Sequence, residues 1–319
     1  MSNNNTTFFV LQPALNKSTL ACDTHSFDFY KVTLPMLVTM AILSPVAVVG
    51  YGLVLAAVWR NPSLRTPSYI LLAGLALTDF CTGIISQPFL VASELVDSLV
   101  KLSGRTIRPS VNLTMRIIGH GCFEYFFNLT LLFMTFMSIE RWLHMSRSSS
   151  LTMGRFHRIM TVLLFIPIPF AVYRFQEIAM FAYLFASVAF VLLCLSVTFV
   201  AYFKVFRIIH RHQQQICSNE SSPSFAQPAI NFAKYKKSVF SILYILGIFY
   251  TGYLPMAITL GLVIVYRENC SMLFFSIYVS ITLVFLSSSL NPLLYLWRMK
   301  DIRQEVRKLV KRIFCKDTD

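Results

Sequence analysis

The sequence predicts an all-α protein: a bundle of seven membrane-spanning helices with a short cytoplasmic amphipathic eighth helix. Seven apolar segments are each long enough to cross a bilayer, which takes about 20 residues as a helix. Hydrophobic residues make up 56% of the chain and charged residues only 13%, which is too apolar for a soluble domain of this length. The last segment also keeps Asn291 and Pro292, which are costly in lipid and therefore predict a specific use.

The predicted spanning segments follow one another closely enough to form one membrane domain. Their ranges are 32–59, 68–96, 114–143, 157–174, 178–207, 236–266 and 272–297. No polar stretch between them is long enough to build a second core. The chain therefore divides into an extracellular glycosylated arm (1–31), the seven-helix domain (32–297), and an amphipathic helix with a cytoplasmic tail (298–319).

The positive charges predict how the chain crosses the membrane. The segments 60–67, 141–158, 204–237 and 298–319 carry 2, 4, 6 and 8 Lys or Arg, which is 20 of the 28 in the chain. Because positive charge marks the cytoplasmic face, the amino terminus is expected outside and the carboxyl terminus inside. The net charge of +14 follows from this bias, so no nucleic-acid partner is expected.

Both ends of the chain carry candidate modification sites. The amino-terminal arm has no basic start before a short apolar core, so no cleavable signal peptide is predicted. Candidate glycan sites begin Asn-x-Ser/Thr triplets on the outer side, or arise there by chance: Asn4, Asn5, Asn16 and Asn112.

The carboxyl-terminal segment alternates basic and apolar residues at helical spacing. Ile302, Val306, Leu309, Val310 and Ile313 predict an apolar face lying on an anionic inner leaflet. Cys315 is either palmitoylated or a free cytosolic thiol.

Five of the predicted helices carry a distinct short motif. In chain order these are Leu75-Ala76-Leu77-Thr78-Asp79, Glu140-Arg141-Trp142, Tyr202 before Lys204-Val205-Phe206, Phe249 with Tyr253-Leu254-Pro255, and Asn291-Pro292-Leu293-Leu294-Tyr295. Their order and depth resemble those of rhodopsin-like (class A) G-protein-coupled receptors over almost the whole chain. The resemblance implies a multi-pass plasma-membrane receptor whose partners are an extracellular ligand, a heterotrimeric G protein and membrane lipid.

Asp79 is an ionisable residue deep in an apolar helix, so it should face the interior and find partners. The resemblance implies that Thr130, Ser287 and Asn291 surround it. This group either binds a hydrated sodium ion or forms a hydrogen-bonded network around a structural carboxyl. Tyr51 stands where the family has an Asn, which we expect to remove one member of the network. No other cofactor is expected.

Arg141 lies at the cytoplasmic end of the third segment. The resemblance implies a switch in which Glu140 holds Arg141 in one state and a G protein binds it in another. Pro255 and Pro292 permit kinks, so the sixth helix can swing outward and open a cleft lined by Tyr202 and Tyr295. The alternatives are an Arg that only snorkels and tyrosines of an interfacial belt. Tyr253 belongs to the sixth-helix motif beside Pro255.

Tyr235 stands where much of the family has an acid that reaches the arginine and closes the inactive state. A phenol flanked by Lys234 and Lys236 supplies no neutralising charge. We therefore expect signalling without ligand.

Several departures from the family pattern indicate which group of receptors within the family the chain resembles. Arg116 occupies the usual disulfide-cysteine position, and the second outer loop, about 174–177, has no Cys. The fifth helix lacks the usual Pro. These departures resemble the melanocortin, cannabinoid and lysophospholipid receptor group. Cys22 and Cys270 either form a bridge outside the membrane or are separate thiols.

The expected ligand region lies in the outer half of the bundle. Phe123 replaces the aminergic Asp and no Lys occurs from 272 to 297, so a peptide or lipid is favoured over a monoamine or retinal. The candidate contacts are Phe89, Glu94, Phe123, Glu124, Phe249 and Tyr253. The aromatic members are alternatively helix packing. Glu94 is expected at the rim, whereas Glu124 either pairs with His120 one turn earlier or contacts a cationic group of the ligand.

No motif of an enzyme is present: the chain has no HExxH, GxSxG or P-loop sequence. A membrane channel or transporter is the main alternative. It would place polar residues along several helices, whereas only Asp79 and Glu124 are expected to be acidic and deep, without a basic partner.

Overall fold

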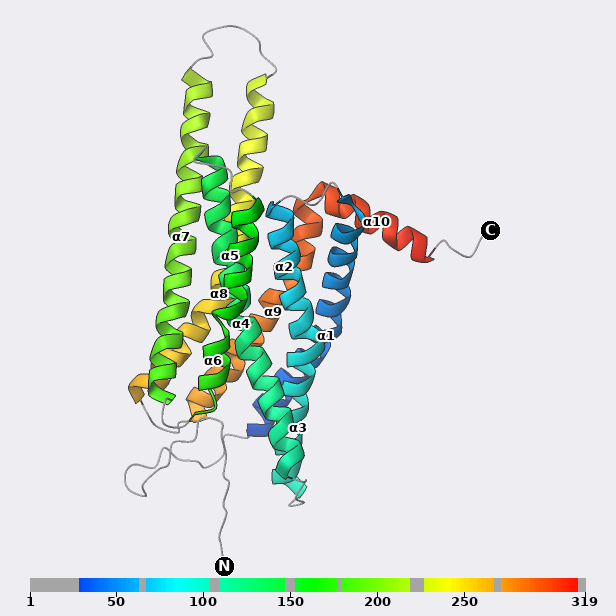
Figure 1. Ribbon diagram of the computed structural model, residues 1–319, viewed down its shortest axis with the longest axis vertical. Coiled ribbons are helices and arrows are strands. Elements are labelled where there is room, and N and C mark those ends of the chain that lie inside the picture. Colours follow the sequence, from blue (N-terminus) through cyan, green and yellow to red (C-terminus); the bar gives the residue numbers. More distant parts are fainter. Residues whose placement is uncertain are drawn as a thin grey trace, which may run out of the picture.

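The computed structural model describes residues 29–62, 67–103, 109–146, 153–176, 180–218, 227–266 and 271–314, and within these ranges the chain is helical with short turns. Long helices run side by side and form one bundle (Figure 1). In the described residues, seven spans are long and apolar enough to cross a membrane. They are Thr33–Arg60, Tyr69–Val96, Leu113–Met145, Gly154–Tyr173, Phe181–Arg211, Leu246–Tyr266 and Phe275–Trp297. The fold class predicted from the sequence is confirmed.

The first three spans are built from helices α1 to α4. They comprise α1 (Phe29–Arg60), α2 (Pro67–Cys81), the π-helical turn η2 (Thr82–Ser86), α3 (Gln87–Ser103) and α4 (Pro109–Met145). The π turn was not foreseen. Ser44 on α1 donates a hydrogen bond to the Gly83 carbonyl oxygen at 2.7 Å. This bond gives a carbonyl within the widened turn a partner on α1.

The fourth span is divided where a single helix was expected. It consists of α5 (Met153–Phe165) and α6 (Ile168–Tyr173), separated by Ile166 and Pro167. Pro167 and Pro169 lack backbone N–H groups, so the hydrogen-bond ladder of α5 cannot continue through them. The short α6 ends next to Arg174.

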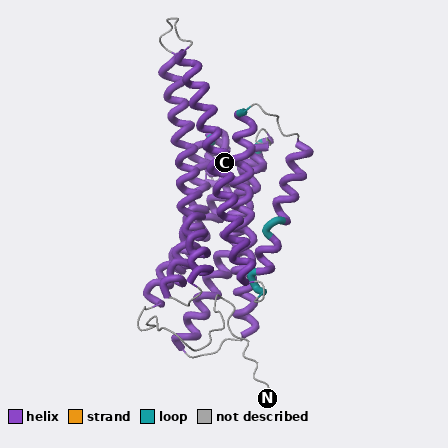
Figure 2. Tube along the Cα trace, turned by 90° about the vertical axis from the view of Figure 1, so that its left-hand side faces the viewer, coloured by secondary structure: helices purple, strands orange, loops and turns teal. Residues whose placement is uncertain are grey.

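The remaining helices are α7 (Met180–Ser218), α8 (Gln227–Tyr266), α9 (Ser271–Arg298) and α10 (Lys300–Phe314). Both α7 and α8 are longer than expected, and they rise together beyond the other helices at the end of the bundle where α10 lies (Figure 1; Figure 2). Large apolar side chains remain exposed along the outside of the bundle, as a lipid-facing surface requires. Val49 on α1 and Leu193 on α7 are each 62% exposed.

Part of the apolar face of helix α10 packs on the bundle. Ile302 is fully buried, and Val306 and Leu309 are 6% and 7% exposed, in the same core cluster as α1 residues. The helix contacts α1 and α9. The position of this helix on the inner leaflet stays a prediction. The basic residues Arg307, Lys308, Lys311 and Arg312 are exposed, with Lys308 paired to Glu305 at 2.8 Å.

Candidate functional site

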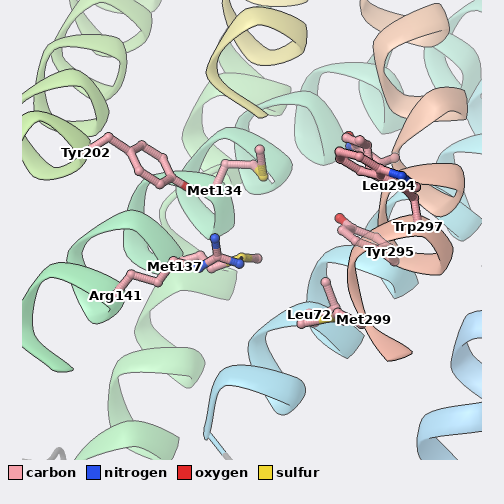
Figure 3. A pocket seen from close by; sticks show the side chains of 10 residues that line it. Leu72, Met134, Met137, Arg141, Tyr202, Leu294, Tyr295, Trp297 and Met299 are labelled. Carbon is pink, nitrogen blue, oxygen red and sulfur yellow. The ribbon is translucent and has the colours of Figure 1, made fainter. Parts of the chain in front are cut away.

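A cavity opens at the α10 end of the bundle, between α4, α7 and α9. It is lined by Leu72, Met134, Met137, Arg141, Tyr202, Asn291, Leu294, Tyr295, Trp297 and Met299. The side chains of Arg141, Tyr202 and Tyr295 come from three different helices and point into this space (Figure 3). The three residues singled out in the sequence for one cleft are thus brought together by the fold.

The Arg141 guanidinium has few hydrogen-bond partners for a charged group that lines a cavity. Its Nη2 lies 3.9 Å from the Met137 sulfur, a weak acceptor, and its buried Nη1 has no hydrogen-bond partner. An unsatisfied guanidinium N–H in a cavity is ready to donate to a carbonyl or carboxylate that enters from outside. Its neighbour Glu140 is 7% exposed.

Next to Arg141 and Tyr202, α4 and α7 are joined by a cation–π contact and by apolar packing. Lys204 Nζ lies 3.9 Å from the ring centroid of Trp142, a cation–π contact. Trp142 also packs with the buried pair Tyr202 and Val205. Tyr202 is therefore fixed at the cavity wall by packing on α4.

Two prolines lie on the helices that could move. Pro255 is inside α8 and Pro292 inside α9, and these two helices pack along each other. A Cβ built on Gly50 of α1 would lie 3.0 Å from Pro292 Cβ, so α9 lies close against α1 at Pro292. A Cβ built on Gly252, one turn before Pro255, would lie 2.5 Å from the Ser287 hydroxyl oxygen on α9. Pro292, and the turn of α8 before Pro255, thus lie where two helices meet.

Asp79 is buried at the centre of the bundle and has several hydrogen-bond partners. The Tyr51 hydroxyl lies 2.5 Å from Asp79 Oδ2 and 2.5 Å from the Ser288 carbonyl oxygen, which joins α1, α2 and α9. Thr130 donates to Asp79 Oδ1 at 3.3 Å, and Asn291 and Ser288 are further partners. Tyr51 is fully buried. It was expected to remove one member of the network, but its hydroxyl is itself a member.

The residues suggested by the sequence for a sodium ion already have other partners. Asp79, Thr130 and Asn291 lie together, and the Ser287 hydroxyl donates to the Ile248 carbonyl oxygen on α8 at 3.2 Å. The Tyr51 hydroxyl contacts Asp79 Oδ2, where it competes with an ion. Sodium binding at Asp79 stays a prediction.

A second polar cluster lies in the half of the bundle away from α10, around Arg174. Its Nη1 lies 3.3 Å from Glu124 Oε2 and 3.3 Å from the Tyr183 hydroxyl, and its Nη2 lies 3.4 Å from His120 Nδ1. Burial by itself lowers the pKa of the Arg174 guanidinium, but Tyr183 and Glu124 raise it above its ordinary value. Arg174 is therefore a permanent cation inside the cluster.

The cluster continues from His120 to α3 and α9. His120 Nε2 lies 3.6 Å from Glu94 Oε1, and the Tyr278 hydroxyl donates to Glu94 Oε2 at 2.5 Å. Glu94 is 7% exposed and is paired inside the bundle. We call Glu94, His120, Glu124, Arg174, Tyr183 and Tyr278 the outer polar cluster.

Arg174 was expected only in a short loop, and its place in this cluster was not predicted. Glu124 is paired internally, but with Arg174 and with Asn128, whose Nδ2 lies 3.1 Å from Glu124 Oε1, rather than with His120. The expectation that no basic residue accompanies the deep acids is also wrong. The useful signal was the position of Arg174: the loop is so short that its first residue stays next to α6 and points back into the bundle.

Below the outer polar cluster, the aromatic candidates pack on one another. Phe123 contacts Phe285 with ring centroids 5.4 Å apart, and Phe249 contacts Tyr253 at 4.8 Å. All four side chains are at most 5% exposed. This burial agrees with the alternative that they pack between helices. Phe89 is only half-buried.

Other candidates lie outside what the structure describes. These are Asn4, Asn5, Asn16, Cys22, Cys270 and Cys315, together with the side chains of Asn112 in α4 and Tyr235 in α8. Among the described residues, Cys81, Cys122 and Cys194 are free thiols, and no group of three or more His, Cys, Asp or Glu residues could hold a metal.

The chain is similar to known receptors over part of its length. Residues 50–172 match the family model described as 7 transmembrane receptor (rhodopsin family). This stretch runs from α1 to α6 and includes Asp79 and Arg141. A curated relative, adenosine receptor A2b of Gallus gallus, is 30% identical over 131 residues, which are 40% of this chain and 36% of that receptor. The match thus spans about a third of the relative's length.

Proposed function

We propose that this chain is a rhodopsin-like G-protein-coupled receptor of the plasma membrane, with its amino terminus outside and its carboxyl terminus inside. An extracellular ligand would favour a state in which α8 swings outward at the α10 end. That state would bind a heterotrimeric G protein at Arg141, Tyr202 and Tyr295. The seven apolar spans, the five motifs and the family match over residues 50–172 support the proposal.

The observation that carries the proposal is the state of Arg141. The Arg141 guanidinium is half-buried, and its buried Nη1 has no hydrogen-bond partner and faces a cavity lined by two tyrosines. A buried N–H in this state costs stability unless a partner accepts from it. A helix end of a G protein presents unpaired backbone carbonyls, which are suitable acceptors for such a donor. The site is thus suited to bind a protein terminus rather than to catalyse a reaction.

The ligand is proposed to be a peptide or a lipid. The two acids of the outer polar cluster are already paired with Arg174, Tyr278 and neighbouring groups. They therefore offer little net negative charge to a free amine, which agrees with the absence of the aminergic Asp. The likeness to adenosine receptor A2b covers 36% of that receptor and does not carry its ligand over. Exposed basic residues of α10 support anionic lipid as a further partner.

The direct test is nucleotide exchange on a purified heterotrimeric G protein by the receptor in lipid nanodiscs. Because basal activity is expected, wild type should accelerate exchange without ligand. Arg141→Ala should remove that acceleration while thermal stability is kept. Arg155→Ala, which changes an exposed arginine of α5 at the same end, is the matched control and should behave as wild type.

The channel or transporter alternative is tested on the same preparation. Ion flux through receptor-containing vesicles in the absence of any G protein would support that alternative. An Arg141→Ala variant that exchanges nucleotide as fast as Arg155→Ala would refute the role of Arg141.

A further inference from the structure

We propose that His120 is a proton-binding site, through which the outer half of the bundle responds to extracellular pH. The imidazole is 5% exposed and lies between a carboxylate on one side and a guanidinium on the other. Proton binding itself does not depend on the proposed function. Its coupling to signalling does rest on that function.

The neighbours of His120 decide which ring nitrogen carries the proton. A guanidinium only donates, so His120 Nδ1, 3.4 Å from Arg174 Nη2, must be the acceptor. The proton of the neutral ring therefore sits on Nε2, which faces Glu94 Oε1 at 3.6 Å without a completed hydrogen bond. The native contacts thus select one neutral tautomer.

A second proton has only one place to go. It must bind Nδ1, the atom that faces Arg174, where an N–H then meets the N–H groups of the guanidinium. Two donors and two positive charges oppose each other there, so the contact between His120 and Arg174 must break. At the same time the cationic ring gains attraction for Glu94, whose other oxygen is bound by Tyr278 of α9.

The consequence is a shift of contacts between helices. Arg174 links α4 to Tyr183 on α7, whereas Glu94 links α3 to α9. Protonation of His120 weakens the contacts of Arg174 and strengthens those of Glu94. The ring therefore acts at a junction between these helices rather than on its own helix alone.

The charges around the ring favour its neutral form in the native state. Glu94 on α3 attracts a proton, and Glu124 on α4 is neutralised by Arg174. The Arg174 guanidinium, whose Nη2 lies 3.4 Å from His120 Nδ1, opposes protonation of the ring, and so does the burial of the ring. The hydroxyls of Tyr183 and Tyr278 contact Arg174 and Glu94, respectively. A solvated His in the unfolded chain thus binds a proton more readily, so stability is lost as pH falls.

The test is thermal unfolding of the full-length protein in nanodiscs at pH 7.5, 6.5 and 5.5. His120→Gln is the decisive variant, because its amide can accept from Arg174 and donate toward Glu94 but cannot be protonated. Wild type should lose roughly 2–4 °C more than His120→Gln between pH 7.5 and 5.5. His144→Gln, at an exposed histidine of the opposite end, should keep the wild-type pH dependence. Parallel curves for wild type and His120→Gln would overturn the proposal.

A second variant keeps the test decisive if His120→Gln does not fold. Arg174→Gln removes the opposing cation, so the acid transition of the wild-type ring should move to higher pH. An unmoved transition would count against His120 as the titrating group. For the coupling, basal G-protein activation in cells should change between outer pH 7.5 and 6 and lose that change in His120→Gln. If stability depends on pH but G-protein activation does not change with outer pH, only the proposed coupling to signalling is overturned.

Discussion

Arg174 and Glu124 form an ion pair, with 3.3 Å between Nη1 and Oε2, although 50 residues separate them in the chain. The glutamate side chain is 5% exposed and the arginine side chain 20%. The pair joins the end of α6 to the middle of α4, and Tyr183 extends it to α7.

Removing the arginine should therefore destabilise the fold. Arg174→Ala leaves a buried carboxylate without its counterion, and we expect a loss of about 2–3 kcal/mol, at the lower end for a buried pair because Arg174 is partly exposed. The double variant Arg174→Ala/Glu124→Gln should recover part of that loss, since no charge is left unpaired. Thermal unfolding of the three proteins measures both effects. A double variant no more stable than the single one would mean that the charge of Glu124 is not the source of the loss.

Tyr51→Phe should destabilise the protein although it removes a single oxygen. Asp79 loses one partner and the Ser288 carbonyl oxygen loses another, which together should cost about 1–3 kcal/mol. Tyr69→Phe removes a hydroxyl that lies 2.9 Å from Asp301 at an exposed place, and it should cost less. The midpoints of thermal unfolding compare the two variants directly. Equal losses would show that the Tyr51 hydroxyl has no special part in the fold.

Sodium should have no specific effect on this protein. The Tyr51 hydroxyl contacts Asp79 Oδ2 and the Ser287 hydroxyl donates to a carbonyl oxygen on α8, so a sodium ion would have to compete with both contacts. We expect the same unfolding temperature in sodium chloride and in choline chloride at equal ionic strength. Asp79→Asn, which cannot bind sodium through a carboxylate, provides the reference. It should change signalling more than folding, because the amide keeps the shape and much of the hydrogen bonding. A saturable stabilisation by sodium in wild type but not in Asp79→Asn would contradict this reading.

Tyr235→Glu should lower basal signalling. A carboxylate in place of the phenol can neutralise Arg141 and favour the closed state, and a gain of about 1.4 kcal/mol would change the ratio of states roughly tenfold. Basal nucleotide exchange at matched surface density measures this, with Tyr235→Phe as the control for loss of the hydroxyl without added charge. Equal activity in all three proteins, or a silent wild type, would mean that another contact closes the cleft.

Gly119→Ala should strain the contact between α3 and α4. A Cβ built there would lie 2.9 Å from the Leu90 backbone nitrogen and 3.0 Å from the Phe89 carbonyl carbon, and backbone atoms cannot move aside cheaply. We expect a loss of about 1–3 kcal/mol. The control is Gly261→Ala in α8, where nothing lies within 4 Å and the better helix propensity of Ala should be neutral or stabilising by up to about 1 kcal/mol. A tolerated Gly119→Ala would show that α3 and α4 can separate without penalty.

The sequence by itself determined the architecture, because a membrane leaves few choices. Every spanning helix must satisfy its own backbone and cover itself with apolar side chains, so seven spans and their approximate ends are visible as composition. The motif residues could be placed by depth, since depth follows from position along a helix of known rise. Arg141, Tyr202 and Tyr295 were expected to share one cavity for this reason, and the fold brings them together.

Only the tertiary structure decided which buried polar groups pair. The partner of Glu124 depends on the rotation of α4 and on where the short loop after α6 places Arg174, and neither is encoded in periodicity along a single helix. Tyr51 likewise looked like the loss of a polar residue, but the length of its side chain lets the hydroxyl reach from α1 to both Asp79 and α9. Depth along a helix is a local property of the chain, whereas side-chain partners depend on the relative rotation and spacing of several helices, which packing of the whole bundle sets.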